Sequence, residues 1–411
     1  MSTASAAPAG GTGAAGTAGA AGAKAAAERR LREDMHDLVS LSEAVHGEPE
    51  LCFEERRAAA RVAEMLESAG FAVERGVCGL DTALRAEVGS GPLTVALCAE
   101  YDALPGIGHA CGHNLIAASA VGAGMALASV AGSIGVRVLV VGTPAEEGGG
   151  GKILLLERGG FHGAHAAMMV HPWPVDRLAA ACLAVDHLAV RYSGRSAHAS
   201  AAPWEGVNAA DALVVAQVAI GLLRQHLHPG DQVHGIVTHG GDAPNVVPGA
   251  AAGSFMVRAP ELQSLSRVRK AVERCFEAGA LATGATLQVE ELSPTYSHML
   301  SDGPLLEAWR RNAEALGRSY ELDDSGEPPP TLSTDMANVS LAIPSIHPLI
   351  GIDARGAVNH QPAFTAACVG ESAAKALYDG ALAMAWTVID AATDTALRTR
   401  LLAGGPAPLP G

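Results

Sequence analysis

Two short polar turns, each directly after a buried apolar run, constrain this chain more than any other feature of its sequence. The first, residues 100–114, reads Glu-Tyr-Asp-Ala-Leu-Pro-Gly-Ile-Gly-His-Ala-Cys-Gly-His-Asn, and the second, residues 144–148, reads Pro-Ala-Glu-Glu-Gly. Together they supply soft, borderline and hard metal ligands plus one spare carboxylate: Cys111, His113, Glu146 and Glu147. A hydrolytic zinc centre needs such a set. The sequence therefore predicts a metal site.

The apolar runs before these turns predict an open parallel α/β arrangement. Residues 93–99 and 136–142 are short apolar runs that end in polar residues, as buried strands do, and residues 116–130 have the pattern of a small-residue helix. In such a strand–helix–strand unit the strands are parallel, and ligands bind at their carboxyl ends. We therefore expect an α/β fold with a mostly parallel central sheet and the metal site at the strand ends.

The pattern changes after residues 171–174, where a second kind of domain is expected. Alternation and helical periodicity follow one another, as in an α+β unit: strand-like residues 184–192, 233–237, 253–258 and 286–292, and helical residues 209–226 and 261–281. We expect residues 182–292 to form a smaller inserted domain. The other expected segments are a disordered Ala/Gly-rich tail at 1–27, a catalytic domain at 28–181 and 293–392, and a C-terminal tail at 393–411.

Composition restricts the classes of function. The chain has 411 residues with 49% apolar content, which is enough for a large core and for two domains. Seven scattered cysteines favour a reducing compartment, and no long apolar run appears, so we expect a cytoplasmic protein without a membrane partner. The formal charge of −15 argues against nucleic acid as a partner and favours neutral or cationic substrates.

Six motifs occur in one order between residues 30 and 392. They are residues 46–54, residues 101–114, residues 142–148, residues 196–199 with 203–208, residues 241–248, and Asn359-His360. By these motifs the chain resembles the aminoacylase/carboxypeptidase-type family of dinuclear zinc amidohydrolases, in the branch of aminobenzoyl-glutamate hydrolases and aminoacylase-1-like β-alanyl dipeptidases. The resemblance implies a zinc-exopeptidase-like catalytic domain whose inserted domain is a lid and the dimerisation surface of a homodimer.

The resemblance also implies roles for individual residues. Cys111 would lie near both metal ions, and the ligands of the individual metals would be His113, Glu147, His171 and His360. Two divalent ions are expected, zinc first and manganese or cobalt as alternatives, sharing a hydroxide that attacks an amide carbonyl. Glu146 would be the general base, and Asp102 would accept the free N–H of a ligating imidazole.

Three residues of the inserted domain are assigned to the substrate by the same resemblance. His198 would stabilise the oxyanion of the tetrahedral intermediate, often from the partner subunit. Asn245 and Arg258 would hold the terminal carboxylate of the substrate. The alternative for His198 is an ordinary surface histidine, and for Arg258 an ordinary strand-end arginine.

The sequence leaves the role of Glu100 and the substrate open. Other branches of the family carry a ligating histidine at the position of Glu100, so this carboxylate is a metal ligand, a partner of a ligand, or a strand-end cap. The expected reaction is hydrolysis of an amide bond in a small dipeptide or an N-acyl amino acid. A deacylase of an acyl-amine and a non-catalytic binding protein with this fold are the alternatives, and the intact ligand set argues against the second.

Overall fold

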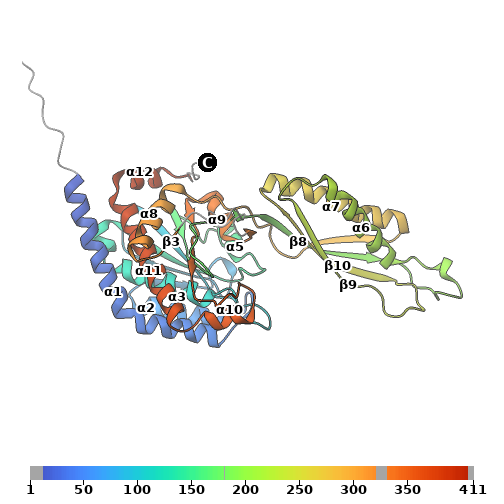
Figure 1. Cartoon of the computed structure of the whole chain (residues 1–411), viewed down its shortest axis with the longest axis horizontal. Helices are drawn as coiled ribbons and strands as arrows, with labels where there is room; N and C mark the ends of the chain where they lie inside the picture. Colours follow the sequence, from blue (N-terminus) through green and yellow to red (C-terminus); the bar gives the residue numbers. More distant parts are fainter. Residues whose placement is uncertain (1–12, 180, 321–330, 406–411) are drawn as a thin grey trace, which may run out of the picture.

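The computed structural model describes residues 13–179, 181–320 and 331–405. A larger body carries most of these residues, and a smaller body, residues 184–291, extends from it (Figure 1). The larger body contains α1 (Gly13–Gly47), α2 (Arg56–Ser68), β1 (Ala72–Arg75), β2 (Leu84–Val88), β3 (Leu93–Glu100), α3 (His113–Ala128), α4 (Ala131–Ile134), β4 (Val136–Thr143), α5 (Gly151–Glu157), β5 (Ala166–Met168), β6 (His171–Trp173), β7 (Ala181–Cys182), α8 (Gly303–Ala315), β12 (Thr331–Leu332), α9 (Met336–Ala342), β13 (Ser345–Ile346), β14 (Leu349–Gly351), α10 (Pro362–Ala367), α11 (Glu371–Thr393) and α12 (Thr395–Ala403). The smaller body contains β8 (Ala184–Ser193), α6 (Ala209–Leu223), β9 (Gln232–His239), β10 (Ala250–Ala259), α7 (Leu262–Thr283) and β11 (Thr286–Glu291).

The central sheet of the larger body has the strand order β1-β2-β4-β3-β5-β13 among the described residues. Strands β4, β3, β5 and β13 are parallel, and β2 and β1 pair antiparallel at one edge. Along β3, Val95 and Leu97 join the core on one face, whereas Ala96 and Cys98 join the core on the other. A strand that is buried on both faces has an almost continuously apolar sequence, as residues 93–99 do. The predicted α/β fold with a mostly parallel central sheet is confirmed.

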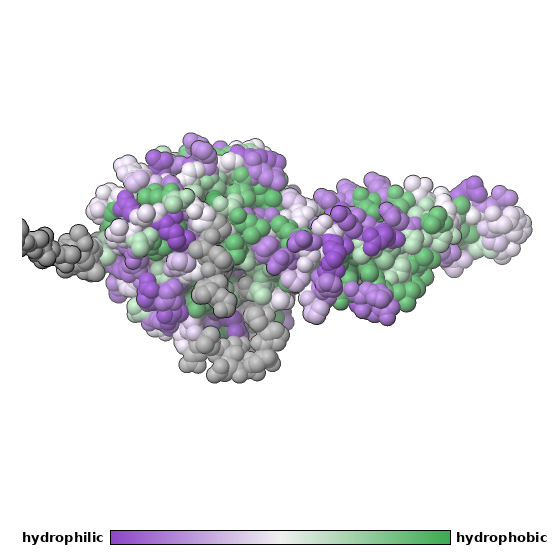
Figure 2. Space-filling view, turned by 90° about the horizontal axis from the view of Figure 1, so that it is seen from above, coloured by the Kyte–Doolittle hydropathy of each residue, from purple (hydrophilic) through white to green (hydrophobic). Residues whose placement is uncertain are grey.

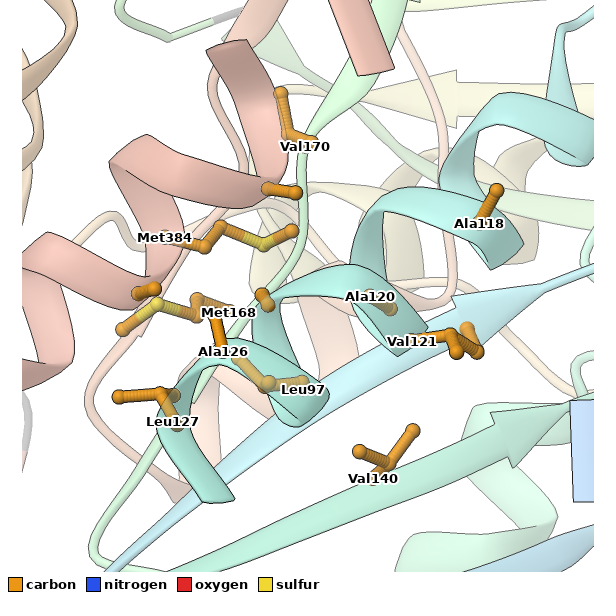
Figure 3. Close-up of a cluster of buried hydrophobic side chains, with 14 of the residues drawn as sticks. Leu97, Ala118, Ala120, Val121, Ala126, Leu127, Val140, Met168, Val170 and Met384 are labelled. Carbon is orange, nitrogen blue, oxygen red and sulfur yellow. The ribbon is translucent and has the colours of Figure 1, made fainter. Parts of the chain in front are cut away.

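Helices cover both faces of this sheet. Helix α3 packs against β3 and is itself covered by α1 and α11. Figure 3 shows the small side chains of α3 packed among Leu97 and Val140 of the sheet and Met384 of α11. On the opposite face, α5 and α9 contribute Leu155 and Met336. Because helices cover both faces, the carboxyl ends of the strands are the part of the sheet that a ligand can reach.

The smaller body is an antiparallel sheet of order β11-β8-β10-β9 in the described part of the protein, with α6 and α7 packed against it. In β10, Phe255 and Val257 are buried in the core that these helices cover, and Met256 between them is exposed. This alternation is typical of an antiparallel sheet with one face in solvent. The expected smaller α+β unit is confirmed, and its role as a lid and dimerisation domain stays a prediction.

The expected disordered tail at residues 1–27 is partly helical, which corrects the prediction. Helix α1 begins at Gly13, and Ala27 is fully buried against the core. Lys24 Nζ forms an ion pair with Asp390 Oδ1 of α11 at 2.7 Å. Alanine has the highest helix propensity, and these contacts with α11 stabilise a helix whose composition alone suggests disorder. Residues 1–12 of the expected tail lie outside the described residues.

The expected C-terminal tail at 393–411 also contains an ordered helix. In α12, Leu401 is fully buried in the main core, and Arg400 forms an ion pair with Asp302 at 2.7 Å. Residues 406–411 lie outside the described residues. Of the helices in the described ranges, none combines the length and the apolar character that crossing a membrane requires.

Candidate metal centre

The predicted ligands gather where the central strands end. Asp102 follows the end of β3, and Glu146 and Glu147 follow the end of β4. Because β3 and β4 are parallel neighbours, both turns lie at the same edge of the sheet. His171 is the first residue of β6, which is held beside β14 by parallel pairing. Segments far apart in the sequence are thus brought to one site.

Cys111 lies at the centre of the five predicted ligands. Its Sγ is 3.4 Å from His171 Nε2 and 3.6 Å from His360 Nε2. Glu147 Oε2 is 3.5 Å from His360 Nε2, and Glu147 Oε1 is 4.0 Å from His113 Nε2. His113 and Glu147 form a close group with Glu146, and two further close groups contain the sulfur: Cys111 with His113 and His171, and Cys111 with Glu147 and His360. The sulfur is shared by these two groups, so the donors fit two neighbouring cations.

Two unusual backbone conformations hold these ligands. Gly112, between two ligands, has a φ of 80°, and a Cβ at this position would lie 2.9 Å from the Pro172 side chain. Only glycine fits such a position without strain. His360 has a φ of 68°, which is uncommon for a residue with a side chain, and its N–H donates to the C=O of Ala110 at 2.9 Å. This bond fixes the His360 loop beside Cys111.

The orientation of the imidazoles and two buried atoms without partners indicate a cation. His171 Nδ1 donates to the C=O of Pro172 at 2.7 Å, and His113 Nδ1 donates to Asp102 Oδ1 at 2.9 Å. Each ring then presents Nε2 as a lone-pair ligand. His113 Nε2 and Glu147 Oε1 are buried and have no hydrogen-bond partner among the described residues. Such atoms are rare in folded proteins, and divalent cations would satisfy both. The donor set therefore fits a metal centre.

Burial shifts the pKa values of the acidic site groups. Burial and neighbouring carboxylates raise the pKa of Glu146 well above its ordinary value, and burial also raises the pKa of Glu147. Burial and the charge of Glu147 raise the pKa of the Cys111 thiol. Asp102 differs, because His113 overcomes the effect of burial and lowers the pKa of Asp102 to about 2. Crowded acidic groups of this kind favour bound cations.

Three side chains from distant parts of the sequence hold the backbone of the turn that carries Glu146. Ala145 N–H donates to Glu55 Oε1 at 2.9 Å, and Glu147 N–H donates to Asp102 Oδ2 at 2.9 Å. Between these two residues, the C=O of Glu146 accepts from the Tyr296 hydroxyl at 2.7 Å. The anchoring residues Glu55 and Tyr296 were not identified from the sequence. Glu55 directly follows the motif at 46–54, which was the one signal near it, and Tyr296 lies in no motif.

Glu100, whose role the sequence left open, belongs to a buried ion-pair cluster. It pairs with Lys152, whose Nζ also lies 2.7 Å from Asp335 Oδ1, and all three side chains are buried. Glu100 Oε2 is 3.5 Å from His113 Nε2. Breaking a buried pair leaves an uncompensated charge, so the ammonium of Lys152 stabilises both carboxylates beside the metal ligands. Lys152 and Asp335 were not predicted as site residues.

A pocket of about 390 Å³ opens over the ligands. Its apolar walls include Trp173, Leu183, Met256 and Leu332, and its polar walls include His187, Gln232, Arg258 and Ser333. Arg258 reaches the pocket from β10 of the smaller body, and its Nη1 donates to Ser333 Oγ at 2.7 Å. The predicted substrate residue Arg258 therefore lies at the pocket.

The other two predicted residues of the smaller body lie elsewhere. The described residues that line the pocket include neither His198 nor Asn245. Both are exposed and adjacent, because His198 forms a β-bridge with Val246 and the N–H of Ala199 donates to the C=O of Asn245 at 3.0 Å. Their expected contacts with the substrate stay predictions.

Comparison with known proteins places this site in a family. Residues 96–380 match the family described as "Peptidase family M20/M25/M40". The Xaa-Arg dipeptidase of Mus musculus is 40% identical over 381 residues, which cover 89% of this chain and 88% of the mouse protein. A p-aminobenzoyl-glutamate hydrolase subunit of Escherichia coli is 32% identical over 279 residues, 63% of this chain and 58% of that protein.

A solved structure supports the fold. The aminobenzoyl-glutamate utilization protein from Klebsiella pneumoniae superposes with a TM-score of 0.69 at 17% identity, over 88% of this chain and 97% of that one. The family match spans more than half of the sequence, and the mouse relative matches along most of its own length. This chain therefore belongs to peptidase family M20/M25/M40 and is a metal-dependent hydrolase of peptide bonds.

Proposed function

We propose that the protein is a dipeptidase that uses two divalent ions, expected to be zinc. The observation that carries the proposal is the position of Cys111 in two close groups of ligand atoms at once. Five ligands are too many for one tetrahedral zinc, but they suit a pair of ions with a shared thiolate. Cys111, His113, Glu147, His171 and His360 would hold the ions, which would supply Lewis-acid activation of the scissile carbonyl and of water.

In this proposal the protein's own residues move the protons and orient the substrate. Glu146 takes a proton from the attacking water and passes it to the leaving amine. Arg258 binds the terminal carboxylate of the dipeptide, because a planar guanidinium matches a carboxylate. Ser333 orients this guanidinium by accepting a hydrogen bond from it. Asn245 adds an amide donor for the same carboxylate. The apolar wall that includes Trp173 limits the access of bulk water.

We infer dipeptides with a C-terminal arginine as the preferred substrates. The relatives in Mus musculus and Homo sapiens, 40% and 37% identical, are Xaa-Arg dipeptidases. The formal charge of −15 also favours the approach of a cationic substrate.

The first prediction follows from this substrate class. The zinc-loaded enzyme should hydrolyse Xaa-Arg dipeptides with a kcat/KM about tenfold or more above that for Xaa-Glu dipeptides, because the net negative charge of the protein favours the approach of a cationic substrate over an anionic one. The panel includes β-alanyl dipeptides, N-acetyl amino acids and aminobenzoyl-glutamate. Faster hydrolysis of N-acetyl amino acids than of every dipeptide would favour the deacylase alternative and contradict the proposed substrate.

The smaller body is proposed to pair with its counterpart in a homodimer. Val214, Val218 and Leu222 form an exposed apolar stripe on α6, one helical turn apart, and Ile236 is exposed on the edge strand β9. Figure 2 shows hydrophobic surface on the smaller body among hydrophilic areas. Exposed apolar stripes and edge strands are typical of protein interfaces. In such a dimer His198 acts on the pocket of the partner subunit.

The hydrogen bonds around His198 leave its Nε2 as the ring nitrogen that can donate. Its Nδ1 accepts from the N–H of Ala201 at 3.2 Å, so the ring proton of the neutral imidazole lies on Nε2. This Nε2–H can donate to an oxyanion that develops in the transition state.

The second prediction tests the trans arrangement. His198→Ala should lower kcat far more than it raises KM, because the interaction is absent from the ground state. Mixing this variant with Glu146→Gln should restore activity, because one site of each heterodimer then has both the intact base and the intact histidine. Exchange of subunits is verified by mass labels. No recovery after verified exchange, or a fully active monomer, would reject the trans role.

A further inference from the structure

Two segments form a ribbon that joins the smaller body to the metal centre. The first is the start of β8, and the second is the segment that follows β11. Leu292 N–H donates to the C=O of His187 at 2.9 Å. Further along, Val185 N–H donates to the C=O of Tyr296 at 2.9 Å, and Tyr296 N–H donates back to Val185 at 3.1 Å. The antiparallel pairing of the smaller sheet thus continues as far as Tyr296.

The side chain of Tyr296 extends from this ribbon to the turn that carries Glu146. Its hydroxyl donates to the C=O of Glu146 at 2.7 Å and accepts the N–H of Gly150 at 2.9 Å. The residue is 3% exposed, and its ring packs with Ile153 and Val185 in a small apolar cluster. A buried hydroxyl with both its donor and an acceptor position used has one defined orientation.

Tyr296 differs from the other anchors of this turn by where it comes from. Glu55 and Asp102 bond the neighbouring residues of the turn from the larger body, beside α2 and β3. Tyr296 instead lies on the ribbon, between Thr295 and Ser297. The side chain of Asn338 in α9 bonds both neighbours: it donates to the C=O of Thr295 and accepts from the N–H of Ser297. The ribbon is therefore fixed to the larger body on both sides of the residue that holds Glu146.

We propose that Tyr296 is a positioning residue that orients Glu146 and ties the turn of the base to the ribbon of the smaller body. The proposal rests on the proposed role of Glu146. The backbone C=O of Glu146 is held by the hydroxyl, so the direction in which its carboxylate leaves the backbone depends on this bond. A displacement of the base by about 1 Å lowers rates strongly, because proton transfer depends on geometry.

The experiment compares Tyr296→Phe with Tyr192→Phe. The matched control removes a buried hydroxyl that donates to the C=O of Phe276 at 2.8 Å, within the smaller body and away from the pocket. Tyr296→Phe should lower kcat by about tenfold or more with KM changed by less than about threefold, because the base acts in the transition state. Tyr192→Phe should keep kcat within about twofold of that of the unchanged protein, even if its thermal stability falls as much as that of Tyr296→Phe.

A second readout does not depend on activity. Amide hydrogen exchange in residues 144–151 should be faster in Tyr296→Phe than in the unchanged protein, because Gly150 N–H loses its acceptor, and Tyr192→Phe should not change it. Unchanged kcat, or lower kcat with unchanged exchange in this segment, would overturn the proposal. Equal losses of kcat in both variants would also overturn it, because they would indicate a general effect on stability.

A double variant separates this proposal from the proposed function. If Tyr296 acts through Glu146, adding Tyr296→Phe to Glu146→Gln should lower kcat little further. An additive loss would show that Tyr296 acts by another route and reject the positioning role. Full activity of Glu146→Gln alone would instead reject the base assignment, while the exchange measurement would still decide whether Tyr296 holds the turn.

Discussion

Glu146→Gln should reduce kcat by about a hundredfold or more while the metal content stays near that of the unchanged protein. The carboxylate of Glu146 lies 3.8 Å from His113 Nε2 at the edge of the ligand set, and it lines the pocket. Glutamine keeps the shape of the side chain but cannot accept and return a proton. KM should change little, because the lost contribution belongs to the transition state.

The neighbouring residue provides the matched control. Glu147 Oε2 lies beside His360, and Glu147 Oε1 is a buried atom without a hydrogen-bond partner among the described residues. Glu147→Gln should therefore lower the metal content directly, and its activity should recover in part at high metal concentration. Equal metal loss in the two variants would remove the distinction between base and ligand on which the mechanism depends.

The sequence predicted the parts of the fold that carry a strong local signal. The apolar runs of β3 and β4 and the small-residue helix α3 lie within a few residues of their expected bounds. These elements are buried on both sides, so their sequences are almost continuously apolar and can be recognised by this composition. Cys111, His113, Glu146 and Glu147 follow from the same signal, because polar residues directly after a buried parallel strand lie at the open edge of the sheet. His171 and His360 were assigned by the family resemblance instead.

Other parts of the fold depend on contacts that a local pattern cannot record. Strands β5, β6, β13 and β14 span only two or three residues each, too few to show alternation, and they exist through pairing with distant partners. The start of α1 was expected to be disordered because its composition is almost entirely small residues. Its helix is stabilised by packing and by the ion pair of Lys24 with Asp390, which are distant in the sequence.

The site shows the same division. Ligands inside a motif could be recognised from the sequence. Tyr296 and Lys152 lie in no motif and reach the site only because folding brings distant segments together. His198 was placed by resemblance alone, and a single protomer leaves it exposed and outside the pocket lining. Residues that act through backbone bonds, or from one protomer on another, leave no local pattern of their own.

Removal of the metal should have the largest effect of all. The ions are expected to contribute several kcal/mol to transition-state stabilisation, so exhaustive chelation should lower activity by about a thousandfold or more. Zinc should restore the activity, and manganese or cobalt should be tested beside it. The melting temperature should also fall on chelation, because ions that bind only the folded state stabilise it.

Elemental analysis of the purified, metal-loaded protein, with kcat measured on the same samples, tests the central claim most directly. Two ligand groups that share Cys111 predict about two divalent ions per protomer, with activity rising and falling with their content. A content well below one ion per protomer in fully active protein, or full activity after exhaustive chelation, would contradict the account.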